Sequence, residues 1–254
     1  MQKSEWIIHQ PNAQRRFRLY CFSYAGGGAA SYLPWQTALD PGIEICAVQL
    51  PGRGARLHET PYTSWPELIQ QLALATVCQN NLPYAFFGHS LGGLVAFELA
   101  RFCKRYLLPM PRRLFVSGCA APQRREPFAP LHELGDDALI EKLKEYDGTP
   151  PELLSNRELM ALVLPTVRAD FALVANYRYR PTLPLETPIT ILAGRSDDRV
   201  SEAQAEGWRA QTTGDFRLHW FEGGHFFIHS ARHKVLDCLA KELEWHQQQI
   251  FNFS

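Results

Sequence analysis

The sequence has no long apolar run, no excess of charge of one sign and no signal-like start. No stretch approaches the ~18 consecutive apolar residues of a membrane-spanning helix, and residues 1–14 hold no apolar core typical of a secretion signal. Its 26 basic residues balance 26 acidic ones, and like charges do not cluster. These absences disfavour nucleic acid and membranes as partners, and we expect a soluble, cytoplasmic protein.

Paired cysteine motifs are also missing. The six cysteines form neither a C-x-x-C pair nor a metal-like cluster with histidine. Several lie in apolar segments, where cysteine usually acts as a small hydrophobic residue. We therefore expect reduced, structural thiols and no metal site. The cysteines are Cys21, Cys46, Cys78, Cys103, Cys119 and Cys238.

What is present is an alternation of short β-type segments with longer helical patterns. Strands are predicted at residues 18–22, 43–50, 84–88, 113–118, 189–194 and 216–222. Helices are predicted at residues 64–80, 91–106, 201–211 and within 229–248. Several strands are apolar without alternation, which is typical of a parallel sheet covered on both faces. The pattern predicts one doubly wound, mostly parallel α/β domain spanning residues 1–254.

Residues 122–184 interrupt this alternation because they contain no convincing strand. Residues 136–146 are amphipathic, and Ser155-x-x-Glu158 resembles a capping pattern before a second helical stretch. Pro165 should kink or split that second helix, since proline removes an amide donor and crowds the preceding turn. A helical insertion between two strands indicates a lid over one edge of the sheet. A helical subdomain that merely completes the core is the alternative.

One pentapeptide carries the first chemical signal. Gly88-His89-Ser90-Leu91-Gly92 matches G-x-S-x-G, the pattern of a nucleophile elbow, in which serine occupies a sharp turn between a strand and a helix. Short patterns of this kind also occur by chance, but here an apolar strand precedes the serine and a helical pattern follows it. Ser90 is therefore a candidate nucleophile at a helix N-terminus, where developing negative charge is favoured.

A serine nucleophile needs a base, and the base needs an acid that orients it. Among nine histidines, His225 follows a predicted strand in a glycine-flanked loop, whereas His89 adjoins Ser90 and should point away from it. The strand at 189–194 ends before two carboxylates, Asp197 and Asp198. We favour Asp197 by its spacing in the turn, with Asp198 as the alternative.

The tetrahedral intermediate of acyl transfer also needs two backbone amides that bind its oxyanion. Leu91, which follows the candidate nucleophile, supplies one of them. The glycine-rich turn "FSYAGGGAASY" (22–32) follows the first predicted strand, and we expect the second donor to be the Ala25 amide. That turn lacks both G-x-G-x-x-G and a P-loop lysine, which disfavours a nucleotide site.

Several motifs together resemble a known family. They are "FSYAGGGAASY", "LPGRGAR", "FFGHSLGG", "LMALVLPTVRADFALVANYRY", "GRSDDRV" and "GGHFFI". The combination resembles the stand-alone type II thioesterases that accompany non-ribosomal peptide synthetases and polyketide synthases, relatives of the medium-chain thioesterase of animal fatty-acid synthesis. "LPGRG" and the segment around "PTVRADF" are the more family-specific motifs. This chain has Ser23-Tyr24 where the family commonly has Pro-His.

The resemblance implies an α/β-hydrolase fold with a helical lid and a triad of Ser90, Asp197 and His225. It implies oxyanion donors at Ala25 and Leu91. It also implies removal of aberrant or stalled acyl groups from the phosphopantetheine arm of carrier proteins, in partnership with synthetase modules. No bound cofactor is expected, because pantetheine arrives with the substrate, and we expect a monomer.

Other functions remain open from the sequence. A cytoplasmic carboxylesterase or an acyl-CoA thioesterase would have the same triad. A non-catalytic, carrier-binding protein with a hydrolase-like fold is a further alternative. For a carrier-docking face, the candidates are the loops "CQNNLP" (78–83) and "RREPFAP" (124–130), with Arg124, Arg125 and Lys142 as basic contacts.

Overall fold

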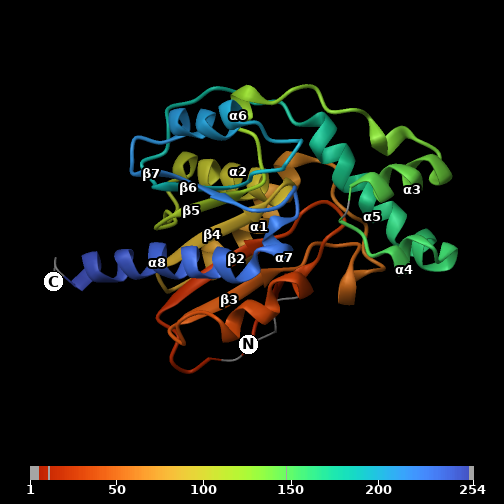
Figure 1. The fold of residues 1–254 in the computed structure, drawn as a ribbon. Helices are drawn as coiled ribbons and strands as arrows, with labels where there is room; N and C mark the ends of the chain where they lie inside the picture. Colours follow the sequence, from red (N-terminus) through yellow and green to blue (C-terminus); the bar gives the residue numbers. More distant parts are fainter. Residues whose placement is uncertain (1–5, 11, 147, 252–254) are drawn as a thin grey trace.

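The centre of the molecule is a seven-stranded sheet in the order β1-β3-β2-β4-β5-β6-β7 (Figure 1). The computed structural model describes residues 6–10, 12–146 and 148–251. The strands are β1 (Ile7–Ile8), β2 (Phe17–Phe22), β3 (Ile43–Val48), β4 (Tyr84–His89), β5 (Leu114–Ser117), β6 (Ile189–Gly194) and β7 (Phe216–Phe221). All six predicted strands are therefore present, with ends that differ by no more than two residues. The prediction missed β1, which is too short to give a periodic signal.

Strand pairing shows why the site forms where it does. Strands β2 to β7 pair in parallel, and the edge strand β1 pairs antiparallel with β3. Strand β2 lies between β3 and β4, so the chain leaves β2 toward one side of the sheet and later continues on the other side. Ligand sites in such sheets form beyond the carboxyl ends of the strands at this switch point. The loops after β2 and β4 are those that contain Ala25 and Ser90.

Helices cover both faces of the sheet and bury its apolar strands in two separate clusters. On one face lie α1 (Trp65–Ala75), α2 (Leu91–Arg105) and α6 (Glu202–Glu206). On the other lie α7 (Phe227–Ser230) and α8 (Arg232–Phe251). Figure 1 shows α8 on the opposite side of the sheet from α2 and α6. This three-layer arrangement is the predicted doubly wound α/β fold.

Short 3-10 helices shape the connections between these elements. They are η1 (Ala29–Ser31), η2 (Leu33–Thr37), η3 (Gly54–Arg56), η4 (Val77–Gln79), η5 (Pro122–Arg124), η6 (Leu131–Glu133) and η7 (Gly207–Gln211). The helix predicted at 64–80 therefore ends earlier, at Ala75, and the one predicted at 201–211 divides into α6 and η7. Of the capping patterns, Ser201 and Gln204 form a full capping box, whereas the Ser64 side chain makes no capping bond.

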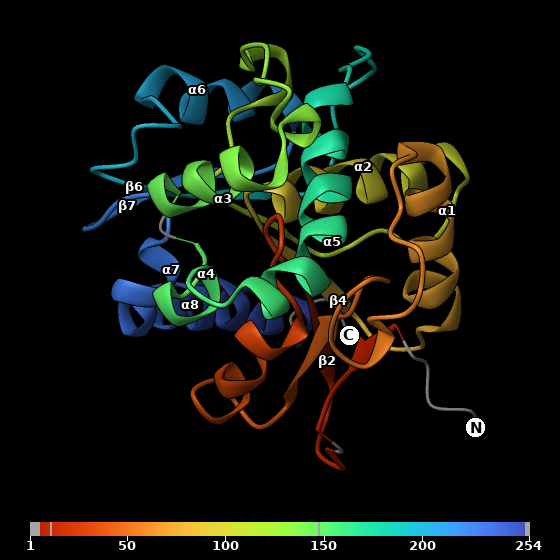
Figure 2. The ribbon, with the colours of Figure 1, turned by 90° about the vertical axis from the view of Figure 1, so that its right-hand side faces the viewer.

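Between β5 and β6 the chain forms α3 (Asp136–Glu145), α4 (Pro151–Leu154) and α5 (Arg157–Asn176). Figure 2 shows these three helices together in front of the sheet. They bury a third apolar cluster of their own, which includes Leu139, Leu143 and Leu164. We define α3, α4 and α5 with their connections, residues 122–184, as the helical insertion.

Two expectations about α5 need correction. The helix is not split at Pro165 but continues through it. Ala161, whose carbonyl group loses its partner to the proline, lies on an exposed part of the helix, where water can take the partner's place. The predicted cap at Ser155 is also wrong, since the capping side chain is Asn156, which accepts a hydrogen bond from the Leu159 amide at 3.1 Å.

None of the helices among the described residues combines the length and apolarity that crossing a membrane requires.

Candidate active site

Ser90 lies in a strained turn between β4 and α2. Its backbone angles, φ 55° and ψ −116°, fall in a region that non-glycine residues rarely adopt. A Cβ atom at Gly88 would lie 2.0 Å from the carbonyl oxygen of Gly92, and one at Gly92 would lie 2.1 Å from that of Phe22. The two glycines are therefore sterically required. They also bring the turn against the end of β2, next to the glycine-rich loop.

Ser90, His225 and Asp197 form a continuous line of hydrogen bonds. The His225 Nε2 atom is 3.1 Å from Ser90 Oγ, and its Nδ1 atom is 2.8 Å from Asp197 Oδ2. The side chains of His225 and Asp197 are 8% and 0% exposed. A buried carboxylate on Nδ1 fixes the tautomer that leaves Nε2 able to accept the serine proton. The structure thus brings together the three side chains that the sequence singled out.

Asp198, the alternative acid, does not reach the histidine. Its side chain is 89% exposed and lies 3.8 Å from Arg199. The second oxygen of Asp197 accepts the Arg199 amide at 2.9 Å, which orients the Asp197 carboxylate toward His225. Backbone bonds join the two loops, since Arg195 donates to Phe221 and Ser196 donates to Gly223. Adjacent parallel strands β6 and β7 therefore position acid and base as one unit.

His89 lies beneath the base and does not contact the nucleophile. It is fully buried, and its Nδ1 atom is 2.9 Å from Ser117 Oγ. Burial, together with the neighbouring His225, lowers the pKa of His89 well below its usual value, which keeps its ring neutral. The His89 and His225 rings lie 5.1 Å apart. A neutral neighbour at that distance does not oppose the positive charge that His225 gains as a base.

Ala25 and Leu91 line the same cavity as Ser90. No described hydrogen bond uses either amide, while the next residue, Gly26, donates to Asp170 at 2.7 Å. Leu91 is the first residue of α2, so its amide belongs to the unpaired N-terminal donors of that helix. Both residues therefore lie at the cavity beside Ser90 and keep a donor that an oxyanion could use.

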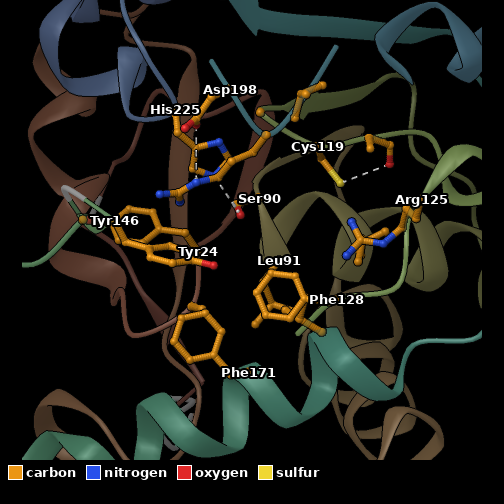
Figure 3. A pocket seen from close by; sticks show the side chains of 18 of the residues that line it. Tyr24, Ser90, Leu91, Cys119, Arg125, Phe128, Tyr146, Phe171, Asp198 and His225 are labelled. Carbon is orange, nitrogen blue, oxygen red and sulfur yellow. Dashed lines mark hydrogen bonds and ion pairs between the residues drawn. The ribbon is translucent and has the colours of Figure 1, made fainter. Parts of the chain in front are cut away.

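A cavity of about 440 Å³ opens beside Ser90. The insertion and the loop that leads into it supply the aromatic walls, with Phe128 stacked on Phe171 and Tyr146 edge-on to Phe171. Figure 3 shows these rings, with Tyr24 and Leu91, around the space beside Ser90 and His225. Polar groups share the lining with these rings, and such a combination suits the binding of a small molecule or an acyl group.

Sequence reasoning missed these wall residues because they come from separate segments. Tyr24 replaces the histidine common in the resembled family, and its hydroxyl lies 3.2 Å from His229 Nε2. Its ring packs edge-on against Phe226, which follows the candidate base. The substitution at Tyr24 was the one signal in the sequence that pointed to this wall.

The expected docking face does not form as one surface. Loop 78–83 leads into the start of β4, while residues 125–128 line the cavity at the opposite ends of the strands. Arg125 extends into the cavity wall near Cys119 (Figure 3). Lys142 is paired with Glu145 on α3 at 2.9 Å. Within the part of the chain that the structure describes, no three His, Cys, Asp or Glu side chains group as metal ligands.

The fold is that of an α/β hydrolase, and the hydrogen-bonded arrangement of Ser90, His225 and Asp197 is the one that serine hydrolases of this fold use. Residues 17–243 match the family model described as "Thioesterase domain", so the chain belongs to that family and is a thioester hydrolase.

Three relatives illustrate the family. "Gramicidin S biosynthesis protein GrsT" of Aneurinibacillus migulanus is 36% identical over 95% of this chain and 95% of its own. The solved structure of "the type II thioesterase BorB from the borrelidin biosynthetic cluster" has 36% identity and a TM-score of 0.86, covering 94% of this chain and 97% of its own. "YbtT - Type II thioesterase from Yersiniabactin NRPS/PKS biosynthetic pathway" has 29% identity and a TM-score of 0.81, covering 93% and 97%.

Proposed function

We propose that this protein is an editing thioesterase that hydrolyses aberrant or stalled acyl groups from the phosphopantetheine arm of carrier proteins in non-ribosomal peptide or polyketide synthesis. The hydrogen-bonded line Ser90–His225–Asp197 beside the cavity is the observation that carries the proposal. Relatives named for gramicidin S, borrelidin and yersiniabactin biosynthesis support the choice of substrate class.

The chemistry proceeds in two halves. His225 Nε2 takes the proton of Ser90 Oγ as that oxygen attacks the thioester carbon. The amides of Ala25 and Leu91 bind the resulting oxyanion, and Asp197 stabilises the imidazolium. His225 then returns the proton to the departing sulfur, which leaves as the pantetheine thiol. The acyl group remains bonded to Ser90.

Water completes the cycle. His225 removes a proton from a water molecule that attacks the acyl-serine ester, and the same oxyanion donors bind the second tetrahedral intermediate. Collapse of that intermediate releases a carboxylic acid, and His225 returns the proton to Ser90 Oγ. The sum is thioester plus water giving acid plus thiol. No bound cofactor takes part in these steps.

The helical insertion acts as a lid in this proposal. It would open to admit a carrier-borne pantetheine arm and then enclose the acyl group against Phe128, Tyr146 and Phe171. A chamber of about 440 Å³ favours small or short acyl groups. We place the enzyme, as a monomer, in the cytoplasm; its six unpaired cysteines suit a reducing compartment.

Hydrolysis of three matched substrates tests the function. The same acyl group is presented on a phosphopantetheinylated carrier protein, on coenzyme A and as a p-nitrophenyl ester. We expect the highest kcat/KM on the carrier, and loss of at least about 10³-fold in kcat on replacing Ser90→Ala. A preference for the simple ester would identify a carboxylesterase, and a preference for coenzyme A an acyl-CoA thioesterase. A folded wild-type protein without turnover would favour a non-catalytic carrier-binding role.

A further inference from the structure

A buried ion pair joins the helical insertion to the sheet outside the cavity. Both Arg53–Asp170 nitrogen–oxygen distances in this bidentate pair are 2.8 Å. Arg53 follows β3 in the "LPGRG" motif, and Asp170 lies in α5. The two side chains are only 9% and 2% exposed, and neither residue lines the cavity. Burying two charges is costly unless they are fully hydrogen-bonded, so their remaining contacts are informative.

Those remaining contacts hold the glycine-rich loop after β2. Asp170 Oδ2 accepts the Gly26 amide at 2.7 Å, and Arg53 Nη1 donates to the Gly27 carbonyl oxygen at 2.9 Å. The Gly26 amide shares a planar peptide group with the Ala25 carbonyl. Fixing that plane fixes the backbone on the C-terminal side of Ala25, which lines the cavity together with Ser90.

The loop needs such an external anchor because its own sequence is permissive. Gly26 has φ +76°, a conformation that glycine adopts freely but does not hold by itself. A shift of the Gly26 backbone would displace the Ala25 Cα atom and, with it, the preceding Tyr24–Ala25 peptide group, which contains the Ala25 amide. A misplaced oxyanion donor loses most of its effect, because its contribution depends on preorganised geometry.

The same pair also anchors the insertion. Thr166, one turn before Asp170 in α5, donates a hydrogen bond to the Gly52 carbonyl oxygen, next to Arg53. Helix α5 therefore contacts the β3 turn through two neighbouring side chains. This part of α5 is tied to the sheet in the structure, which limits lid movement to the segments that precede it.

We propose that Arg53 and Asp170 are positioning residues that hold the Ala25 amide in its oxyanion-binding orientation. They act through the loop and do not touch the substrate. The inference rests on the proposed function, because it requires that a tetrahedral intermediate forms at Ser90. It also gives a physical role to two sequence motifs, "LPGRG" and "PTVRADF", that lie far apart in the chain.

The first test replaces Asp170→Asn, with Glu44→Gln as the matched control. Glu44 is also a fully buried carboxylate that accepts an arginine bond, from Arg18 at 2.8 Å, but it lies at the start of β3, away from the site. We expect Asp170→Asn to lower kcat by about 10- to 100-fold with KM changed less than about threefold. We expect Glu44→Gln to lower Tm by about as much as Asp170→Asn does. Its kcat and KM should nevertheless stay close to the wild-type values.

A second readout reports on the oxyanion site directly. A trifluoromethyl ketone analogue of the acyl-pantetheine thioester adds Ser90 Oγ to its carbonyl carbon and forms a tetrahedral oxyanion. We expect its inhibition constant to rise in Asp170→Asn by about the factor by which kcat falls, because both depend on the same donors. A merely structural role would leave this inhibition constant unchanged in the folded fraction.

The double variant Arg53→Met, Asp170→Leu separates positioning from stability. Replacing a buried ion pair by apolar side chains of similar volume often preserves or raises stability. We expect a folded protein with Tm at or near that of the wild type, but with the low kcat and weak ketone inhibition of Asp170→Asn. Wild-type kcat in this stable double variant would overturn the inference.

The two proposals fail in different ways. If wild-type protein hydrolyses carrier thioesters, Ser90→Ala does not, and the Asp170 and Arg53 variants keep full kcat and ketone inhibition, then the positioning role is wrong and the thioesterase function stands. If wild-type and Ser90→Ala proteins show equal turnover, the proposed chemistry at Ser90 itself is wrong.

Discussion

The ends of the sheet strands and the helical insertion differ in how tightly their geometry is determined. At the strand ends, Gly88 and Gly92 on either side of Ser90 are enclosed by backbone atoms at distances that permit no Cβ. The insertion has its own small apolar cluster, and its helices contact the sheet through a limited set of side chains, among them Asp170 and Thr166. The first region allows one arrangement, whereas in the second only the segments before the anchored part of α5 are free to shift.

The two regions therefore have different roles in the proposed reaction. Ser90, Asp197 and His225 all follow sheet strands, so the reacting groups share one rigid frame. Phe128, Phe171 and the other insertion residues of the cavity wall contact the acyl group in our proposal. Substitutions at the strand ends should therefore change the rate of chemistry for every substrate. Substitutions in the insertion should change which acyl groups react fastest.

The largest effect in this comparison is expected from Asp197→Asn. An amide in place of the carboxylate favours the wrong imidazole tautomer and cannot stabilise the imidazolium, so we expect kcat to fall by about 10⁴-fold on every acyl group. Asp198→Asn is the matched control, because its exposed side chain does not reach His225, and we expect less than about a twofold change. Steady-state rates of thiol release measure both. Equal losses in the two variants would contradict the assignment of the acid.

A smaller, selective effect is expected from Phe171→Leu. The smaller side chain enlarges the chamber, and we expect the ratio of kcat/KM for hexanoyl over acetyl thioesters to rise about tenfold. Phe17→Leu is the control, since Phe17 is equally buried but packs on the opposite face of the sheet, away from the cavity. Competition between the two thioesters, followed by chromatography of the acids, measures the ratio. An unchanged ratio in Phe171→Leu would remove this ring from the acyl chamber.

The same contrast explains what the sequence could predict. The pattern that marks the elbow at Ser90 lies within five positions, residues 88–92, so it is visible in the sequence, although Phe22 of a distant strand is what excludes a side chain at Gly92. Asp197 and His225 each follow a strand whose register is set by its apolar pattern, and spacing from the strand end sufficed to favour Asp197 over Asp198. The succession of strands and helices along the chain, and the doubly wound sheet covered on both faces, followed from alternation of the two periodicities, whereas the order of strands within the sheet was not predicted.

What escaped prediction depends on contacts between distant segments. Arg53 and Asp170 are 117 positions apart, and nothing in the two residue types indicates that their side chains pair with each other. The wall formed by Tyr24, Phe128 and Phe171 joins three segments whose packing no local pattern encodes. The cap of α5 was misplaced by one residue because Ser155 and Asn156 are both good capping residues, and only the path of the chain after α4 decides between them.

The acyl-enzyme is the species that tests the central claim most directly. Wild-type protein is mixed with an acyl-loaded carrier, quenched in acid within milliseconds and digested, and the peptide that contains Ser90 is examined by mass spectrometry. The account predicts that this peptide gains the mass of the acyl group, that the adduct decays at a rate consistent with turnover, and that Ser90→Ala protein forms none. Turnover without an adduct on Ser90, or with the acyl group on another residue such as Cys119, would contradict it.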